Sequence, residues 1–170
     1  MIQQEIANAK KGKKAAIRIK INNITDTQLI DKLYHASQAG VKISMIVRGI
    51  CCLKPGIKNL SENITVISIV DRYLEHSRFM IFENGGAPHY FLTSADFMER
   101  NMDHRIEVGT IILSEEIQKE LEMIFEMQWK GSVKARLISA DMKNNYHKRD
   151  LPPFHAQREI YKYYSKKVTE

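Results

Sequence analysis

The sequence predicts an α/β fold in which helices flank a mixed β-sheet, as a single domain over residues 1–170. Three observations support this prediction. A chain of 170 residues with 44% apolar content can build one core of ordinary size. Segments with a period of two alternate along the chain with segments of helical period. A strand–helix–strand unit over residues 15–47 favours a right-handed parallel crossover.

The first four elements follow from local patterns. Residues 2–11 carry apolar side chains at helical spacing, and residues 15–21, AAIRIKI, alternate as a strand does. Thr25 and Asp26 are suited to cap a second helix that ends at Gly40. Residues 41–47, VKISMIV, predict the next strand. These elements make up the predicted crossover.

The rest of the chain continues the same alternation. Further strands are expected at residues 64–70, 79–83, 90–93 and 106–113, and a long helix at residues 115–129. A short extended segment at residues 133–139, a polar and turn-rich stretch at residues 141–153 and a closing amphipathic helix at residues 155–167 follow. The chain is therefore expected to end on a helix outside the sheet.

Net charge and hydropathy limit the classes of protein. The formal charge of +6 and the pI near 9.3 favour an anionic partner, although a merely solvated surface also explains the lysines clustered near both ends. No apolar run approaches the roughly 20 residues that span a bilayer, and the first residues carry no signal-peptide core. The sequence therefore favours a cytoplasmic protein.

The two cysteines are sequence neighbours. A disulfide between Cys51 and Cys52 would close a strained eight-membered ring, so we expect reduced thiols, with a paired-thiol redox switch as the sharper alternative. The histidines share no metal-ligand spacing with each other or with the cysteines. We therefore predict no metal site.

Residues 71–78, DRYLEHSR, carry the strongest chemical signal. His76 and Arg78 are two residues apart, so on an extended backbone they project from the same face. A titratable nitrogen beside a bidentate guanidinium suits phosphate contact or phosphoryl transfer. The alternative is a histidine that is hydrogen-bonded in the core, with Arg78 paired to Glu75 or Glu83.

Other polar residues follow the predicted strands. Arg48 follows one apolar strand, and Asp71 and Arg72 follow the next. In open α/β sheets, ligands collect at the carboxyl ends of the strands. The segment TSADFMERNMDHR then supplies Ser94, Asp96, Asn101, Asp103 and Arg105, a polar cluster that is larger than a turn needs.

The spacing of His76, Arg78, Glu83 and Ser94 resembles the H-x-K-x4-D motif of the phospholipase D superfamily, with Arg78 in place of lysine and Glu83 in place of aspartate. The resemblance implies a phospholipase-D-like fold. Enzymes of that superfamily bring two such motifs together, one histidine attacking phosphorus and the other protonating the leaving group. This chain has one motif, so a second copy or another domain must complete the site.

Longer strings resemble one branch of that superfamily, the C-terminal domain of bacterial polyphosphate kinase. They are SMIVRGICCLKPGI, SENITVISIVDRYLEHSRFMIFENGG, FLTSADFMERNMDHRIEV, KARLI and HAQREIYKYY. The resemblance implies that residues 1–170 are the C-terminal catalytic domain of an enzyme that transfers the terminal phosphate of ATP to polyphosphate, without its preceding domains. The isolated domain is then expected to be inactive.

The same resemblance implies roles for single residues. Arg48 matches an arginine that contacts the ATP phosphates, and His76 matches a histidine that lines the nucleotide site and acts as acid, base or positioning donor. Arg78, Arg72 and Arg105 are expected to supply positive potential for phosphate, or else to pair with Glu75, Asp71 and Asp103. The phosphorylated histidine and the magnesium ligands are implied to lie in the preceding domains.

The implied partners are ATP, polyphosphate, the preceding domains of the same polypeptide and further copies in a homo-oligomer. Peripheral membrane association is compatible with the family, and no nucleic acid is expected. One rival interpretation is a phosphodiesterase or nuclease that dimerises to pair two copies of His76. Another is a non-enzymatic polyanion-binding module that uses the lysines near the two ends.

Overall fold

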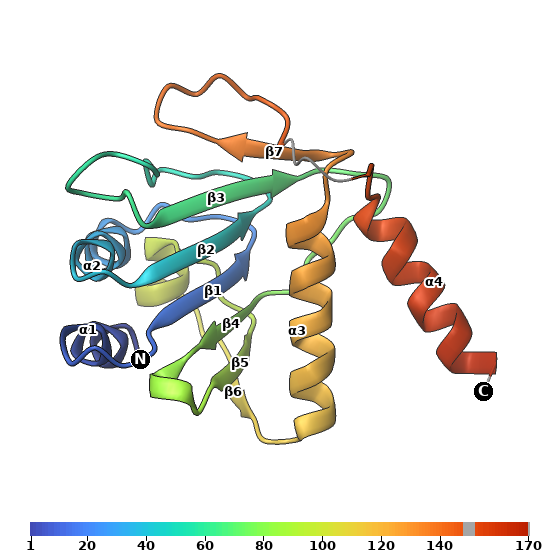
Figure 1. The fold of residues 1–170 in the computed structure, drawn as a ribbon, viewed down its shortest axis with the longest axis horizontal. Coiled ribbons are helices and arrows are strands. Elements are labelled where there is room, and N and C mark those ends of the chain that lie inside the picture. Colours follow the sequence, from blue (N-terminus) through green and yellow to red (C-terminus); the bar gives the residue numbers. More distant parts are fainter. Residues whose placement is uncertain (148–151, 170) are drawn as a thin grey trace.

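A computed structural model describes residues 1–147 and 152–169, and within them a mixed sheet lies between layers of helices (Figure 1). The strand order is β6-β5-β4-β1-β2-β3-β7. The parallel centre consists of β1 (Ala16–Ile21), β2 (Lys42–Val47) and β3 (Ile64–Ile69). The antiparallel flanks consist of β4 (Phe79–Phe82), β5 (His89–Thr93), β6 (Gly109–Ile112) and β7 (Ala135–Ile138). The predicted fold class is confirmed.

Helices cover both faces of the sheet. Helices α1 (Ile2–Lys10) and α2 (Thr27–Gln38) lie on one face, and α3 (Glu115–Lys130) lies on the other, with α4 (Ala156–Thr169) outside it (Figure 1). Ile17 and Ile19 of β1 point into the core beneath α1 and α2, and Phe79 meets Phe125 of α3 edge to face, with ring centroids 6.3 Å apart. Two apolar cores therefore hold three layers together.

The crossover forms as its capping residues predict. The carboxylate of Asp26 accepts a hydrogen bond from the backbone N of Leu29 at 2.8 Å, which satisfies an amide that the first turn of α2 leaves free. Gly40 follows the helix with a φ of +89°, a conformation that costs glycine little. Strands β1 and β2 then pair in parallel, as the sequence analysis predicts.

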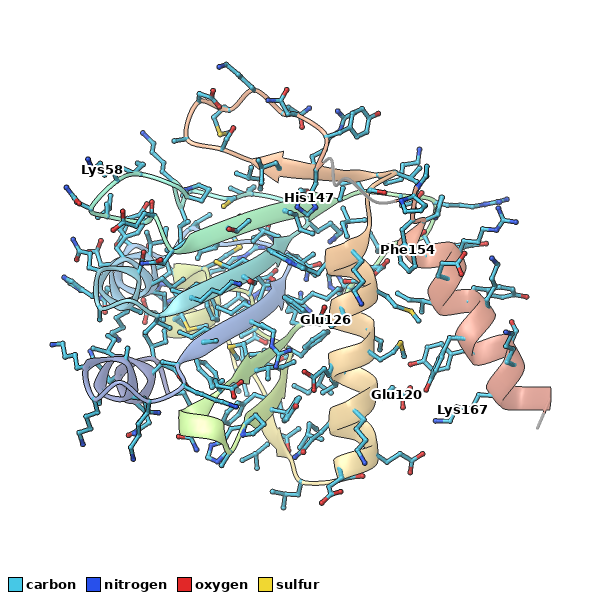
Figure 2. The ribbon with its side chains drawn as sticks, viewed as in Figure 1. Lys58, Glu120, Glu126, His147, Phe154 and Lys167 are labelled. Atoms are coloured by element: carbon cyan, nitrogen blue, oxygen red, sulfur yellow. The ribbon has the colours of Figure 1, made fainter. Side chains whose placement is uncertain are left out.

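Helices α3 and α4 form an antiparallel pair in which α3 packs on the sheet and α4 lies outside it (Figure 1). Lys167 lies 3.9 Å from Glu120 and 3.5 Å from Glu116, and Tyr164 donates a hydrogen bond to Glu120 (Figure 2). Along the described parts of the chain, none of the helices combines the length and the apolarity needed to cross a membrane.

Two predicted segments differ from the structure. The strand expected at residues 106–113 shortens to Gly109–Ile112, because residues 100–104 form a π-helical turn and the chain leaves it with Ile106 fully exposed. The turn-rich stretch predicted at residues 141–153 lies partly outside the described residues. The remaining elements begin and end within about two residues of their predicted bounds.

We predict that Asp26→Ala lowers the free energy of unfolding by about 1 kcal/mol, because α2 loses its N-terminal cap. Urea unfolding followed by circular dichroism measures the difference. The matched control is Asp31→Ala, which removes an exposed carboxylate from the same helix. Equal losses in the two variants would contradict the capping role.

Candidate functional site

Five chain segments meet at one edge of the sheet because of the strand directions. The parallel strands β1, β2 and β3 end there, β4 begins there, and β5 ends there. The residues delivered to this edge include Asn22 and Asn23 after β1, Arg48 after β2, Arg78 before β4 and Asp96 after β5. Polar groups that are far apart in the sequence therefore become neighbours, as expected for the carboxyl edge of an α/β sheet.

Asp96 joins three of these segments. The residue is 4% exposed, and its carboxylate accepts hydrogen bonds from the backbone N atoms of Asn22 and Asn23 at 2.7 and 3.2 Å. The side-chain amides of the same two residues also donate to it. Arg78 Nε donates at 3.0 Å and completes a buried ion pair. Removing Asp96 would leave the loops after β1 and before β4 without a common acceptor.

The acidity of Asp96 reflects these contacts. Burial by itself would raise the pKa of this carboxyl, but the hydrogen bonds from Arg78, Asn22 and Asn23 outweigh it and hold the pKa below the ordinary value. The carboxylate is therefore ionised at neutral pH and provides a fixed negative charge behind Arg78.

His76 lies between two guanidinium groups. Arg48 Nη2 is 3.4 Å from its Nδ1, and Arg78 Nη2 is 3.1 Å from its Nε2. Arg48 is held in turn by Asn22, whose Oδ1 accepts from Arg48 Nε at 2.9 Å. With the Asp96 contacts, these side chains form a closed ring of five residues: Arg48, Asn22, Asp96, Arg78 and His76.

Gly49 allows the loop after β2 to approach the loop after β1. A Cβ atom at this position would lie 2.6 Å from Asn23 Oδ1 and 3.1 Å from the backbone O of Asn22. Gly49 also donates its backbone N to Asn22 O at 2.7 Å. The glycine that follows Arg48 in the sequence thus sets the distance between Arg48 and its partner Asn22.

A second polar network, centred on Lys20, supports the loop that carries His76. Lys20 of β1 is 4% exposed, donates to the Oγ and backbone O of Ser77 at 2.9 and 3.1 Å, and lies 3.7 Å from Glu75. Burial lowers the pKa of Lys20, and the carboxylate of Glu75 opposes that effect. The residues on both sides of His76 are therefore linked to β1, Ser77 through its backbone and side chain and Glu75 through its carboxylate.

Helix α4 fixes the same loop from outside. Gln157 accepts a hydrogen bond from the backbone N of Tyr73 at 3.0 Å and donates to the backbone O of Tyr73 at 2.8 Å and to Glu75 at 3.0 Å. Gln128 of α3 also donates to Glu75. Figure 1 shows the segment after β3 passing beside the start of α4. The closing helix therefore positions the loop that carries His76.

An acidic group flanks Arg78 on the side of β6. Glu107 accepts hydrogen bonds from Ser94 and Asn101, which lower the pKa of its carboxyl. Ser94 also accepts from the backbone N of Val108 at 3.0 Å. The polar segment after β5 that the sequence singled out is thus organised around Glu107, which the sequence analysis did not select.

The structure groups some predicted site residues and separates others. Arg48, His76 and Arg78 are brought together, whereas no described contact joins Arg72 or Arg105 to them. Glu83, the counterpart of the motif's aspartate, lies at the opposite end of β4, where its backbone N donates to Ala16 O at 3.0 Å. The motif spacing spans the length of a strand, so its last position is far from His76.

The ion pairs predicted as alternatives for Arg78 and Arg72 have the wrong partners. Arg78 forms its ion pair with Asp96 and not with Glu75 or Glu83. Asp71 lies 3.5 Å from His155, and it accepts from the backbone N of Arg72 rather than from its guanidinium. The true partners come from other strands and helices, so adjacency in the sequence gave no signal for them.

Asn22, Lys20 and Gln157 were missed by sequence reasoning. The signal for Lys20 is a charged residue near the end of a strand that helices cover on both faces, and that covering is visible in the structure alone.

The two cysteines are free thiols, and burial raises the pKa of Cys51 to about 11. Cys51 is therefore a poor nucleophile at neutral pH.

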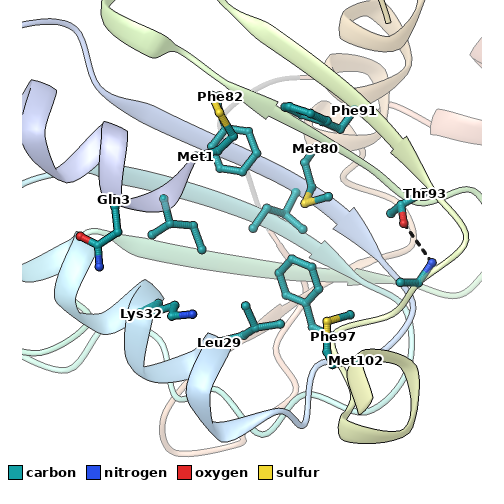
Figure 3. Close-up of a pocket in the computed structure, with 13 residues that line it drawn as sticks. Met1, Gln3, Leu29, Lys32, Met80, Phe82, Phe91, Thr93, Phe97 and Met102 are labelled. Atoms are coloured by element: carbon teal, nitrogen blue, oxygen red, sulfur yellow. Dashed lines mark hydrogen bonds between the residues drawn. The ribbon is translucent and has the colours of Figure 1, made fainter. Parts of the chain in front are cut away.

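An apolar groove of about 440 Å³ lies between α1, α2 and strands β4 and β5 (Figure 3). Met80, Phe82, Phe91 and Phe97 form its walls. It carries few polar groups and does not include the ring around His76. The polar edge of the sheet is therefore the candidate functional site.

The fold is that of a phospholipase-D-like domain. The structure resembles Nuc of Salmonella typhimurium, a phospholipase D family member, with a TM-score of 0.56 and 14% identity over 79% of this chain and 88% of Nuc. At this identity the likeness concerns the fold.

The chain belongs to the polyphosphate kinase family. The family model of polyphosphate kinase C-terminal domain 2 matches residues 1–157. The polyphosphate kinase of Vibrio cholerae is 52% identical over 149 residues, and that of Escherichia coli K12 is 45% identical over 164 residues. The crystal structure of polyphosphate kinase from Porphyromonas gingivalis superposes with a TM-score of 0.93 at 44% identity, over 98% of this chain.

This chain matches a minor part of each of those proteins. It spans 21% of the Vibrio cholerae protein, 24% of the Escherichia coli protein and 26% of the Porphyromonas gingivalis chain. The resemblance stated from the sequence strings is confirmed as family membership.

We predict that Asp96→Asn lowers the free energy of unfolding at neutral pH by roughly 2–4 kcal/mol, because Arg78 loses its buried partner. Since the folded-state pKa of Asp96 is lowered, its contribution is fully present above the ordinary value of about 3.9 and is lost as the pH falls through the folded-state pKa. Urea unfolding at stepwise lower pH should therefore show the two proteins converging.

The control for this experiment is Asp103→Asn, which neutralises an exposed carboxylate in the same segment. It should unfold like the wild type at every pH. A gap between the Asp96→Asn variant and the wild type that does not narrow in acid would contradict the assigned role of the carboxylate.

Proposed function

We propose that this chain provides the ATP and phosphate contacts of a polyphosphate kinase, which transfers the terminal phosphate of ATP to polyphosphate through a phosphohistidine. The observation that carries the proposal is the pair of guanidinium groups facing both ring nitrogens of His76. Family membership and the basic charge of +6 support the same substrates.

The hydrogen-bond inventory of this group explains why it suits phosphate. Guanidinium groups only donate, and a neutral imidazole has a single acceptor nitrogen. His76 can therefore satisfy one of Arg48 and Arg78 at a time, and the cluster has more donors than acceptors. Phosphate oxygens supply the missing acceptors and carry the opposite charge.

In the proposed reaction, Arg48 holds oxygens of the nucleotide phosphates and offsets negative charge on the group in transfer. Asn22 fixes the direction of its guanidinium, and Asp96 does the same for Arg78. His76 is exposed between them and can donate or accept a proton at the leaving or entering oxygen. In each of these roles the donor is a side chain that the hydrogen bonds among the five residues already orient.

The proposed phosphohistidine lies in polypeptide outside these residues, and magnesium also does not fit this edge. Mg²⁺ prefers oxygen ligands in an octahedron, whereas the carboxylate of Asp96 is consumed by amides and Arg78, and that of Glu75 by Gln157 and Gln128. Within the described residues, no three His, Cys, Asp or Glu side chains converge as a cation site.

We predict that Arg48→Ala weakens ATP binding to the 170-residue chain roughly tenfold, because it removes charge-assisted hydrogen bonds to phosphate. Wild-type affinity should fall as salt is added, since the contacts are between charges. Isothermal titration calorimetry at low and high ionic strength measures both effects.

Lys42→Ala is the matched control, because Lys42 is exposed at the other end of the same strand, β2. It removes one positive charge and should leave ATP affinity unchanged. Equal losses in the two variants, or an affinity that does not respond to salt, would count against the proposed site.

We further predict that the 170-residue chain alone synthesises no polyphosphate from ATP, because it carries a single copy of the H-x-R-x4-E pattern, at His76, Arg78 and Glu83. Incubation with labelled ATP and separation of long-chain product provides the measurement. Sustained synthesis by the purified chain would refute the proposal that the nucleophile lies elsewhere. Hydrolysis of a model phosphodiester that is lost in His76→Ala would favour the rival hydrolase.

A further inference from the structure

Arg72 lies in a second pocket, apart from the ring around His76. The pocket has a volume of about 350 Å³, and its walls come from the segment after β3 and the start of α4. Six residues line it: Arg72, Tyr73, His155, Gln157, Arg158 and Tyr161. The Arg72 predicted from the sequence therefore lines a pocket that includes neither Arg48 nor Arg78.

This pocket has an excess of positive charge. Across the described parts of the chain, neither Arg72 nor Arg158 forms an ion pair, and both are exposed. The acidic groups nearby are engaged: Asp71 lies beside His155 at 3.5 Å, and Glu159 beside Lys162 at 2.8 Å. Two guanidinium groups that face one cavity repel each other, and a bound anion relieves that repulsion.

The backbone of the pocket is held in place. Gln157 ties the start of α4 to Tyr73 through both its amide oxygen and its amide nitrogen, at 3.0 and 2.8 Å. The guanidinium of Arg72 lies 5.8 Å from the ring centroid of Tyr73. The walls are thus preorganised although the arginine tips face solvent, which lowers the entropic cost of binding.

The pocket lies close to the first site along the chain. Arg72 and His76 are four residues apart, so their Cα atoms are separated by at most roughly 14 Å. The 71–78 segment is the wall that both sites share. A flexible linear polyanion could occupy both sites at once, whereas a single phosphate could not.

We propose that this pocket is a second anion subsite, which holds the body of a linear polyphosphate chain whose end reaches Arg48, His76 and Arg78. The inference rests on the proposed function for its substrate class. A nucleoside fits less well, because a purine edge needs both a donor and an acceptor and the amide of Gln157 is engaged at both ends. The face of Tyr73 is likewise partly covered by Arg72.

The test compares long-chain polyphosphate, tripolyphosphate and ATP as ligands of the 170-residue chain by calorimetry. The double variant Arg72→Ala with Arg158→Ala is expected to bind long-chain polyphosphate about tenfold more weakly. ATP affinity should be unchanged, and tripolyphosphate affinity should change little, because these short ligands fill the first site. Long-chain affinity in the double variant should then approach that of tripolyphosphate.

The control is Lys10→Ala with Lys11→Ala, which removes the same charge from an exposed cluster at the end of α1. This control should bind long-chain polyphosphate as the wild type does. Equal losses of long-chain affinity in the two double variants would mean that binding depends on general charge attraction and not on this pocket. That result would overturn the inference. The inference would also be overturned if the Arg72 and Arg158 variant bound long chains with wild-type affinity. It would be overturned as well if the wild type did not bind long chains.

Failure of this inference can be distinguished from failure of the proposed function. Arg48→Ala tests the first site through ATP, and the double variant tests the pocket through the dependence on chain length. Loss of ATP affinity in the double variant would assign the pocket to the nucleotide and overturn the inference while leaving the proposed kinase function intact. A charge-preserving pair, Arg72→Lys with Arg158→Lys, should restore most long-chain affinity.

Discussion

The buried carboxylate of Asp96 is the contact on which the site depends, because it ties the end of β5 to the loops after β1 and before β4. Each amide that reaches it would otherwise be buried without a partner, so the loops gain stability only in this arrangement. The same charge orients Arg78, and through Asn22 the arrangement extends to Arg48. The hydrogen bonds made to the Asp96 carboxylate therefore also place the guanidinium groups of Arg48 and Arg78 next to His76.

The 71–78 segment is supported from three elements and contributes to both the ring around His76 and the pocket around Arg72. Lys20 of β1, Gln128 of α3 and Gln157 of α4 hold its backbone and Glu75 beneath it. With the loop fixed in this way, His76 faces the first site and Arg72 faces the second. A loop that is anchored by buried polar groups can present exposed ones in a defined geometry, which is what electrostatic binding of phosphate requires.

Patterns in the sequence located the polar edge of the sheet but mis-assigned some of its contacts. The strand ends predicted Arg48 and Arg72 at one edge, the spacing of two predicted His76 and Arg78 on one face, and the family resemblance linked Arg48 to His76. The structure brings Arg48, His76 and Arg78 together and leaves Arg72 apart. The partners of Arg78 and Asp71 were wrong because they lie 18 and 84 residues away in the sequence, on Asp96 and His155. Glu83 was grouped with His76 by motif spacing, whereas β4 separates them.

The sequence by itself determined the order of helices and strands, the crossover, the family resemblance and the three residues at the centre of the site. Those features depend on local periodicity, on capping residues such as Asp26 and on short strings of adjacent residues, all of which can be read along the chain. Only the tertiary structure decided the partners in the ion pairs and the burial of Lys20. It also decided that Arg72 and Arg158 share a pocket apart from Arg48. Those outcomes depend on packing between segments that are remote in the sequence, where burial and charge select partners that no local pattern specifies.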